Sequence, residues 1–224
     1  MGPDTTVDFM AKVIAATPAA RDQDHARLLV DQNPALPNRQ DALLGDGDDP
    51  GPEMAAMALG LERAGADFLV MPCNTAHAFA PAIRGAVAIP LVSIIDVTVD
   101  ACRGHEVVGV MATEGCVKAR LYQEALSAAG IRPILPDDES IEEITRLEFA
   151  IKLGDRSPEL SAGMQALAKS LIAQGAGALV AACTEIPLVL SQDMLDVPLV
   201  SSTDMLARVT AAICAGNRPL PDQK

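Results

Sequence analysis

Tryptophan is absent from this sequence of 224 residues, and one tyrosine and four phenylalanines make up its Phe, Trp and Tyr content. Half of the residues are nevertheless hydrophobic, so a core has to be built from Ala, Val, Leu, Ile and Met. A chain of this length suits one large domain or two small ones. It has no apolar run of the roughly 18–20 residues that cross a bilayer, and no signal peptide pattern. We therefore expect a cytoplasmic protein.

Basic residues are scarce: 17 Lys and Arg stand against 30 Asp and Glu, which gives a formal net charge of −13. Phosphate binding needs a basic patch, so this charge balance disfavours a nucleic-acid partner. It equally disfavours an anionic membrane surface as partner. What remains is a chain that acts on small molecules or on other proteins.

The cysteines are five in number and form no C-x-x-C pair. In a cytoplasmic chain, an odd and scattered set argues against both a disulfide framework and a structural zinc site. We expect no metal. The cysteines are Cys73, Cys102, Cys116, Cys183 and Cys214.

Short apolar runs alternate with longer amphipathic segments, which predicts parallel sheets with helices on both faces. Such sheets collect ligands at the carboxyl ends of their strands. The strands are expected at 27–31, 68–71, 91–94, 107–112, 132–135, 178–182 and 199–201, and the helices include 52–64, 119–129 and 159–174.

The chain repeats itself. "GADFLVMPCNT" (65–75) aligns with "GAGALVAACTE" (175–185), and "IPLVSIID" (89–96) aligns with "VPLVSSTD" (197–204). Each half therefore ends one strand in a cysteine, Cys73 or Cys183. Two similar halves can face each other across a cleft, although duplicated structural cysteines would give the same pattern.

The two halves differ at the start. In the second half a strand precedes the loop and helix of "TEGCVKARLYQEAL", whereas no strand precedes the corresponding "MGPDTTVDFM". Either the true start lies upstream, or the first sheet lacks a strand. An open gap in a parallel sheet would be costly, because the neighbouring backbone groups lose their partners.

A cysteine that directly precedes a helix N-terminus is a candidate for acid–base chemistry. The helix dipole and the first backbone N–H groups stabilise a thiolate and lower its pKa from about 8.5. Two such thiols on opposite sides of a substrate can remove a proton from one face of a carbon and return a proton to the other. Such a pair inverts the carbon without a cofactor.

The motifs place the chain in a known group: it resembles the cofactor-independent aspartate racemases of the Asp/Glu racemase superfamily. The resemblance rests on "MGPDTT", "DQNPALPNR" (31–39), "GADFLVMPCNTAH" (65–77), "GVMATEGCVKARLYQEAL" (109–126), "AIKLGD" (150–155) and "GALVAACTEIPLVL" (177–190). These motifs span nearly the whole chain in the family's order.

The resemblance implies two flavodoxin-like α/β subdomains of three layers each, related by a pseudo-twofold axis, with the active site in the cleft between them. We expect residues 1–98 in the first subdomain and 99–204 in the second, with 205–224 packing back on the first. It also implies a homodimer, no cofactor and a small amino acid, aspartate, as substrate.

The same resemblance implies roles for single residues. Cys73 and Cys183 are the expected acid–base pair, and Arg39 and Lys152 the cations that hold the side-chain carboxylate. Glu185 is a candidate partner of the substrate ammonium. The remaining expected binding residues are Met1, Asn33, Asn74, Thr75, Thr113 and Thr184.

Other residues have simpler interpretations. His77 follows Cys73 by four residues and can approach its thiol, but a supporting or packing role is favoured over a Cys–His nucleophile pair. Cys102 and Cys214 lie on helical segments and are interpreted as packing residues. Cys116, near Thr113, is interpreted in the same way.

We predict an amino-acid racemase that interconverts L- and D-aspartate by two-cysteine proton transfer at Cα. Alternatives within the superfamily are glutamate racemase, broad-specificity racemase, hydantoin racemase, maleate isomerase and arylmalonate decarboxylase. The alternative from another class is an inactive paralogue that binds a dicarboxylate.

Overall fold

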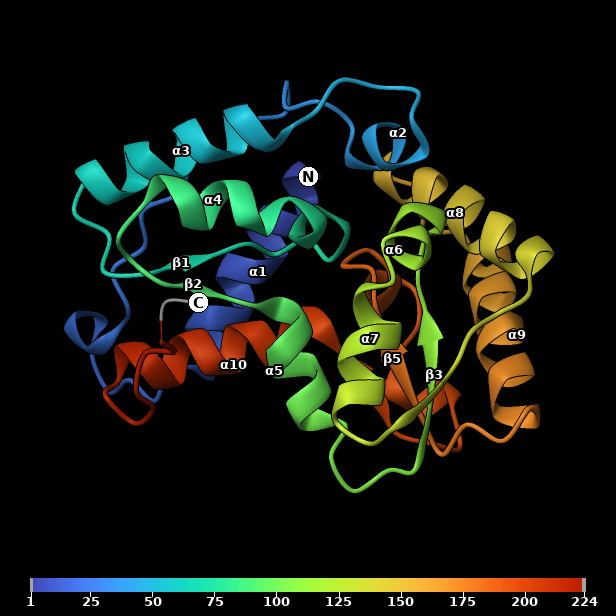
Figure 1. Cartoon of the computed structure of the whole chain (residues 1–224). Coiled ribbons are helices and arrows are strands. Elements are labelled where there is room, and N and C mark those ends of the chain that lie inside the picture. Colours follow the sequence, from blue (N-terminus) through green and yellow to red (C-terminus); the bar gives the residue numbers. More distant parts are fainter. Residues whose placement is uncertain (1, 223–224) are drawn as a thin grey trace.

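The computed structural model describes residues 2–222, so Met1, an expected binding residue, lies outside the described part. Two parallel sheets organise the chain (Figure 1). The first consists of β1 (Leu69–Val70) and β2 (Leu91–Val92). The second has the order β4-β3-β5-β6, with strands at Val107–Met111 (β3), Arg132–Ile134 (β4), Ala178–Ala181 (β5) and Leu199–Ser201 (β6).

The strand pairing repeats between the two sheets. In the first, Leu69 lies opposite Leu91 and Val70 opposite Val92. In the second, Leu179 lies opposite Leu199 and Val180 opposite Val200. The sequence repeat is therefore also a repeat of register, which puts Cys73 and Cys183 at equivalent positions beyond equivalent strands.

Helices surround both sheets. The first sheet is accompanied by α1 (Pro3–Ala16), α3 (Gly51–Arg63), α4 (Ala80–Ala86) and α5 (Ile94–Ala101). The second is accompanied by α6 (Glu114–Lys118), α7 (Leu121–Ala128), α8 (Asp138–Lys152) and α9 (Pro158–Ala173). Short 3₁₀ helices occupy Asp22–Asp24, Thr75–Phe79, Ile186–Leu188 and Gln192–Met194.

Two helices connect the parts. The helix α10 (Ser202–Cys214) follows β6 and packs against α1 and α5. The short helix α2 (Arg39–Leu44) precedes α3 in the chain but contacts α6 (Figure 1). As a result, the segment that carries Arg39 reaches the helices of the second sheet.

Polar caps start the helices that follow the strands. Ser93 accepts a hydrogen bond from the backbone N–H of Asp96, and Ser201 accepts one from that of Asp204. These serines occupy matching places in the repeated "PLVS" segments. A serine at this position satisfies one of the otherwise unpaired N–H groups of the first turn, so the repeat fixes where α5 and α10 begin.

Aliphatic side chains make up most of the core, as the composition requires, with Phe9 and Tyr122 as buried aromatic residues in it. One apolar cluster spans both sheets: it joins Phe9 and Val92 with Val110, Val180 and Leu206. A second lies between β5, α8 and α9, and a third lies between β1, α3 and α4. The shared cluster ties the halves together by burial of aliphatic side chains.

The expected fold class, an α/β fold with parallel sheets, is confirmed, whereas one local prediction is wrong. Residues 27–31 form no strand, since no strand pairs with them among the described residues. The helix expected over 119–129 is present as α7 (Leu121–Ala128), which begins after Arg120, a residue with a left-handed backbone (φ of 56°). No helix within residues 2–222 is long and apolar enough to span a membrane.

A buried hydrogen-bonded chain links the two halves beside the cysteines. The Tyr122 hydroxyl on α7 donates to Asn74 Oδ1 at 2.6 Å, and Asn74 Nδ2 donates to Ser202 Oγ at 3.0 Å. Ser202 in turn donates to the carbonyl of Ala181, at the end of β5, at 2.8 Å. Asn74 is thus held between the two sheets.

Replacing Tyr122 by Phe should destabilise the protein by about 1–3 kcal/mol, because Asn74 Oδ1 would be buried without its donor. The free energy of unfolding in urea measures this effect. Ser127→Ala, at an exposed position of the same helix, is the matched control and should change stability by less than about 0.5 kcal/mol. Equal stabilities of Tyr122→Phe and the unsubstituted protein would show that this chain does not hold the halves together.

Candidate active site

A small pocket lies where the carboxyl ends of β1, β3 and β5 meet. Most of the residues predicted from the sequence line it together. The lining residues are Gly2, Asn38, Arg39, Gln40, Pro72, Cys73, Asn74, Thr75, Thr113, Glu148, Lys152, Cys183, Thr184 and Glu185.

Both predicted catalytic cysteines lie in this pocket. Cys73 follows β1 and is partly exposed, whereas Cys183 follows β5 and is 8% exposed. Each precedes a short 3₁₀ helix, at Thr75–Phe79 and Ile186–Leu188. Because the two strands belong to different sheets, one cavity receives a thiol from each half.

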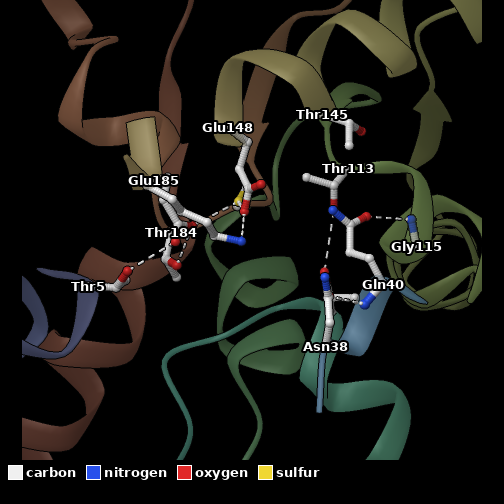
Figure 2. Close-up of polar contacts among 12 residues, drawn as sticks. Thr5, Asn38, Gln40, Thr113, Gly115, Thr145, Glu148, Thr184 and Glu185 are labelled. Atoms are coloured by element: carbon white, nitrogen blue, oxygen red, sulfur yellow. Dashed lines mark hydrogen bonds and ion pairs between the residues drawn. The ribbon is translucent and has the colours of Figure 1, made fainter. Parts of the chain in front are cut away.

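Cys183 sits between two carboxyl groups (Figure 2 shows Glu148 and Glu185). Its Sγ donates to Glu185 Oε2 at 3.1 Å and lies 3.7 Å from Glu148 Oε1. Glu185 also accepts hydrogen bonds from the Thr184 and Thr5 hydroxyls, at 3.0 and 3.2 Å. These contacts fix the carboxylate of Glu185 against the thiol.

Lys152 forms an ion pair with Glu148, four residues earlier on α8. Burial pulls the pKa of Lys152 down, but the charges of Glu148, Cys183 and Glu185 more than compensate, and its pKa is raised. Burial raises the pKa of Glu148, against the effect of Lys152. Glu148 Oε2 is buried and has no hydrogen-bond partner within residues 2–222.

The electrostatics of Cys183 differ from the expectation of a stabilised thiolate. Burial, then the charges of Glu185 and Glu148, raise the pKa of this thiol well above its ordinary value, and Lys152 only partly opposes them. The helix N-terminus alone would favour a thiolate. The carboxyl groups of Glu185 and Glu148 act in the opposite direction and keep Cys183 a thiol.

Arg39 lines the pocket from the start of α2. Its Nη1 donates to the carbonyls of Leu36 and Pro37, at 3.2 and 2.8 Å. Its Nε is buried and has no hydrogen-bond partner in the described part of the chain. A buried guanidinium donor of this kind is suited to an acidic ligand.

Hydroxyl and amide groups also line the pocket. Thr75 Oγ1 and Thr113 Oγ1 lie 3.4 Å apart, one from each half. Gln40 Oε1 accepts from the backbone N–H of Gly115 at 3.0 Å, and the Gln40 N–H donates to Asn38 Oδ1 (Figure 2). These contacts fasten the Arg39 segment to the start of α6.

His77 does not contact the thiol of Cys73. Its Nε2 accepts from the Ile94 N–H at 3.1 Å, so Nδ1 carries the proton and donates to the Cys73 carbonyl at 2.8 Å. Burial lowers the pKa of His77 to about 4, although the Cys73 carbonyl opposes this shift. The neutral imidazole connects the chain at Cys73 to the first residue of α5.

Asn33 does not line the pocket. It donates through Nδ2 to Glu53 Oε1 at 2.6 Å, and its Oδ1 accepts from the Ala35 N–H. Conversely, Glu148, Gln40 and Gly2 line the pocket although sequence reasoning did not select them. The i, i+4 spacing of Glu148 and Lys152 on one helix was the available signal.

The other cysteines lie elsewhere. Cys102 and Cys116 are buried in the shared apolar cluster, where burial raises the pKa of each thiol to about 12. Cys214, expected to pack, is exposed at the last residue of α10. The helix ends there, which leaves its side chain at the surface.

One trio of described residues could hold a metal ion: Glu148, Cys183 and Glu185 have ligand atoms within 4.8 Å of one another. The ammonium of Lys152 already pairs with Glu148. A divalent cation would therefore have to displace this ammonium. The same carboxyl groups are equally suited to a substrate ammonium.

The match to known proteins agrees with this geometry. The family model of the Asp/Glu/Hydantoin racemases matches residues 1–210. The chain belongs to this family. The resemblance drawn from the paired cysteine motifs is thereby confirmed.

Three relatives show which named proteins this chain is similar to. The broad-specificity amino-acid racemase RacX of Bacillus subtilis is 28% identical over 217 residues, 95% of this chain and 94% of RacX. The aspartate racemase of Picrophilus torridus superposes with a TM-score of 0.86 at 26% identity, over 98% of this chain and 92% of that one. An aspartate racemase homologue of Pyrococcus horikoshii, 24% identical with a TM-score of 0.75 over 95% of each chain, shares the fold.

His77 should make stability depend on pH. Its folded pKa of about 4 lies below the unfolded value of 6.5, so its contribution is complete above pH 6.5 and is lost as pH falls towards 4. Between pH 7 and 5 the loss should be about 2 kcal/mol. Urea unfolding of the parent and of His77→Gln at both pH values measures it. His25→Gln, at an exposed position, should retain the parent's pH dependence, and an unchanged dependence in His77→Gln would contradict the assignment.

Proposed function

We propose that this protein is a cofactor-independent amino-acid racemase that interconverts L- and D-aspartate by proton transfer between Cα and two cysteines. The observation that carries the proposal is the equivalent placement of Cys73 and Cys183 after β1 and β5, on one pocket that also holds cationic side chains. The family match and the fold of the Picrophilus torridus aspartate racemase support it.

The reaction breaks the Cα–H bond and passes the proton to the thiolate of one cysteine, which leaves the electron pair on the substrate. The thiol of the other cysteine then donates its proton to the opposite face of Cα. One thiolate and one thiol are present before and after, in exchanged positions. The carboxylate that accepts negative charge needs preorganised donors, and Thr75, Thr113 and the backbone N–H groups after the cysteines are the candidates.

Cys183 begins as the acid of the pair. Its raised pKa and its hydrogen bond to Glu185 keep it a thiol in the ligand-free protein. A turnover that gives this proton to Cα leaves Cys183 as the thiolate and Cys73 as the thiol, which is the state that serves the other direction. Glu185 Oε2 accepts the hydrogen bond of the Cys183 thiol at 3.1 Å, so Glu185 acts through Cys183 as a positioning group.

Aspartate fits the charges of the pocket. The unpaired Nε of Arg39 is a donor for a side-chain carboxylate. Glu185 and the unpaired oxygen of Glu148 offer acceptors for the ammonium, as both line the pocket. These groups complement the side-chain carboxylate and the ammonium of a dicarboxylic amino acid.

One observation favours broad specificity as the second candidate. The ion pair with Glu148 engages Lys152, one of the two cations expected to bind the side-chain carboxylate. A neutralised lysine selects less strongly for an acidic side chain, and the relative RacX is named for broad specificity. Both candidates use the same two cysteines.

Proton exchange at Cα is the direct test. The purified protein is incubated with L-aspartate in D₂O, and NMR follows deuterium at Cα while a chiral assay follows D-aspartate. Cys73→Ala and Cys183→Ala should each lower racemisation by at least about 10²-fold. A single variant that still exchanges the Cα proton of only one enantiomer would identify the face served by each thiol.

The control is Cys214→Ala, which removes an exposed thiol outside the pocket and should leave the rate unchanged. Exchange with other amino acids but not with aspartate would select the broad-specificity alternative. No exchange with any amino acid, together with dicarboxylate binding, would select the inactive paralogue and exclude the racemase.

Glu148→Gln should separate the two substrate assignments. Removing this charge frees Lys152 and lowers the pKa of Cys183, because Glu148 raises it. The KM for aspartate should fall several-fold relative to the KM for neutral amino acids, and the pH dependence of Cα exchange should move to lower pH. Glu139→Gln, exposed on the same helix, is the control. Unchanged selectivity would show that the Glu148–Lys152 pair does not influence substrate choice.

A further inference from the structure

The thiol of Cys183 and the carboxyl groups of Glu148 and Glu185 form a compact buried group. One ligand atom of each residue lies within 4.8 Å of those of the other two. The three residues are buried, with exposed fractions of 8%, 2% and 5% in the order named. Carboxylates at a surface are solvated by water, whereas buried charges have to be paired or to coordinate a metal. This group therefore requires positive charge beside it.

A proton and an ammonium meet this requirement. The proton lies on Cys183, whose Sγ donates to Glu185 Oε2, and the ammonium is that of Lys152, which pairs with Glu148. The pairing is incomplete, because Glu148 Oε2 is buried and has no hydrogen-bond partner within residues 2–222. One divalent cation can replace both single positive charges, and it can also take the unpaired oxygen as a ligand.

The spacing of the ligand atoms suits a tetrahedral zinc ion. Zn–S bonds of about 2.3 Å and Zn–O bonds of about 2.0–2.2 Å at tetrahedral angles place the sulfur and each oxygen about 3.6 Å apart. Cys183 Sγ lies 3.1 Å from Glu185 Oε2 and 3.7 Å from Glu148 Oε1, on either side of this value. Magnesium and calcium prefer oxygen ligands alone, whereas a thiolate ligand favours zinc.

Neighbouring hydroxyl groups hold one of the carboxylates in place. Glu185 accepts hydrogen bonds from Thr184 at 3.0 Å and from Thr5 at 3.2 Å. Contacts that orient a ligand carboxylate in this way accompany metal sites in proteins. The sequence argument against a metal considered paired cysteines, whereas this group combines one cysteine with glutamates from α8 and from the segment after β5 (Figure 2).

We propose that Glu148, Cys183 and Glu185 form a binding site for one zinc ion. On binding, Cys183 gives its proton to solvent, because a thiol coordinates as the thiolate. The sulfur and an oxygen of each carboxylate then bond the ion, and the Lys152 ammonium leaves Glu148. No electron is transferred. Three protein ligands leave one of the four zinc positions for water or another small ligand.

Zinc at this site would inhibit the racemisation proposed above, a consequence that rests on the proposed function. A zinc-bound thiolate has lost the proton that Cys183 would give to Cα, and its electron pair is held by the ion. Glu148 and Glu185 would at the same time be unavailable to the substrate ammonium. Zinc and the amino acid would therefore compete for the same side of the pocket.

Calorimetric titration of the reduced protein with zinc chloride tests the site, and cobalt chloride serves as a spectroscopic probe of its ligands. We expect one zinc ion per chain and, with cobalt, the ultraviolet charge-transfer band of a thiolate ligand. Cys183→Ala should abolish this band. Glu148→Gln and Glu185→Gln should each weaken zinc binding at least about tenfold, since even the loss of a residue that only orients a ligand costs that much.

Lys152→Met gives a prediction of opposite sign. The ammonium competes with the ion for Glu148, and methionine removes its charge while keeping an unbranched side chain. Zinc should therefore bind at least about tenfold more tightly to this variant, a result that misfolding would not produce. Unchanged or weaker binding would contradict the proposed site.

The controls are the cysteines outside the group. Cys73→Ala removes the other thiol of the pocket and Cys214→Ala an exposed thiol, and both should keep the cobalt band and the zinc affinity. A parent protein that binds no zinc, or a band that survives Cys183→Ala, would overturn the proposal. These measurements contain no amino acid, so their outcome is independent of the proposed racemase activity.

Discussion

The side chain of Asn74 is the point on which the geometry of the pocket depends. Its two polar atoms bond Tyr122 and Ser202, and Ser202 bonds the carbonyl of Ala181. Asn74 directly follows Cys73, and Ala181 lies two residues before Cys183. A few buried hydrogen bonds therefore set how the two strand ends face each other. Because they are buried, loss of one partner carries the full cost of an unpaired polar group.

The groups around Cys183 carry charges of both signs. The carboxyl groups of Glu148 and Glu185 approach the thiol, Lys152 pairs with Glu148, and Cys183 remains protonated. The two thiols thus begin in different environments although the backbone repeats. An asymmetry of this kind is needed for a two-base reaction, because one group has to hold a proton when the other does not.

The elements that could be predicted from the sequence are those set by local pattern. The apolar runs identified all six strands of the described residues, β1 to β6, and the repeat identified the paired cysteines at their strand ends. Residues whose position depends on contacts with distant chain segments were harder to predict. Glu148 was overlooked because its i, i+4 spacing from Lys152 predicts an ion pair on one helix but does not show that this pair faces the pocket. Asn33 was misplaced because Glu53, twenty positions later, bonds its amide.

The predicted strand over residues 27–31 failed for a different reason. Its apolar pattern is intact, but a strand exists only through its pairing partners, and none lies beside it within the described residues. The pKa of Cys183 was likewise misjudged because a sequence motif specifies the helix start but not the carboxyl groups that fold towards it. Both errors arise because the outcome depends on tertiary neighbours, absent beside residues 27–31 in the described part of the chain and present beside Cys183.

The scarcity of aromatic residues has a practical consequence. Tyr122 is the only tyrosine, tryptophan is absent, and Tyr122 is fully buried in the hydrogen-bonded chain between the halves. Ultraviolet emission from this protein therefore comes almost entirely from one phenol at the junction of its two sheets. This phenol bonds Asn74, the residue that directly follows Cys73, so its emission reports on the part of the molecule that sets how the two cysteines face each other.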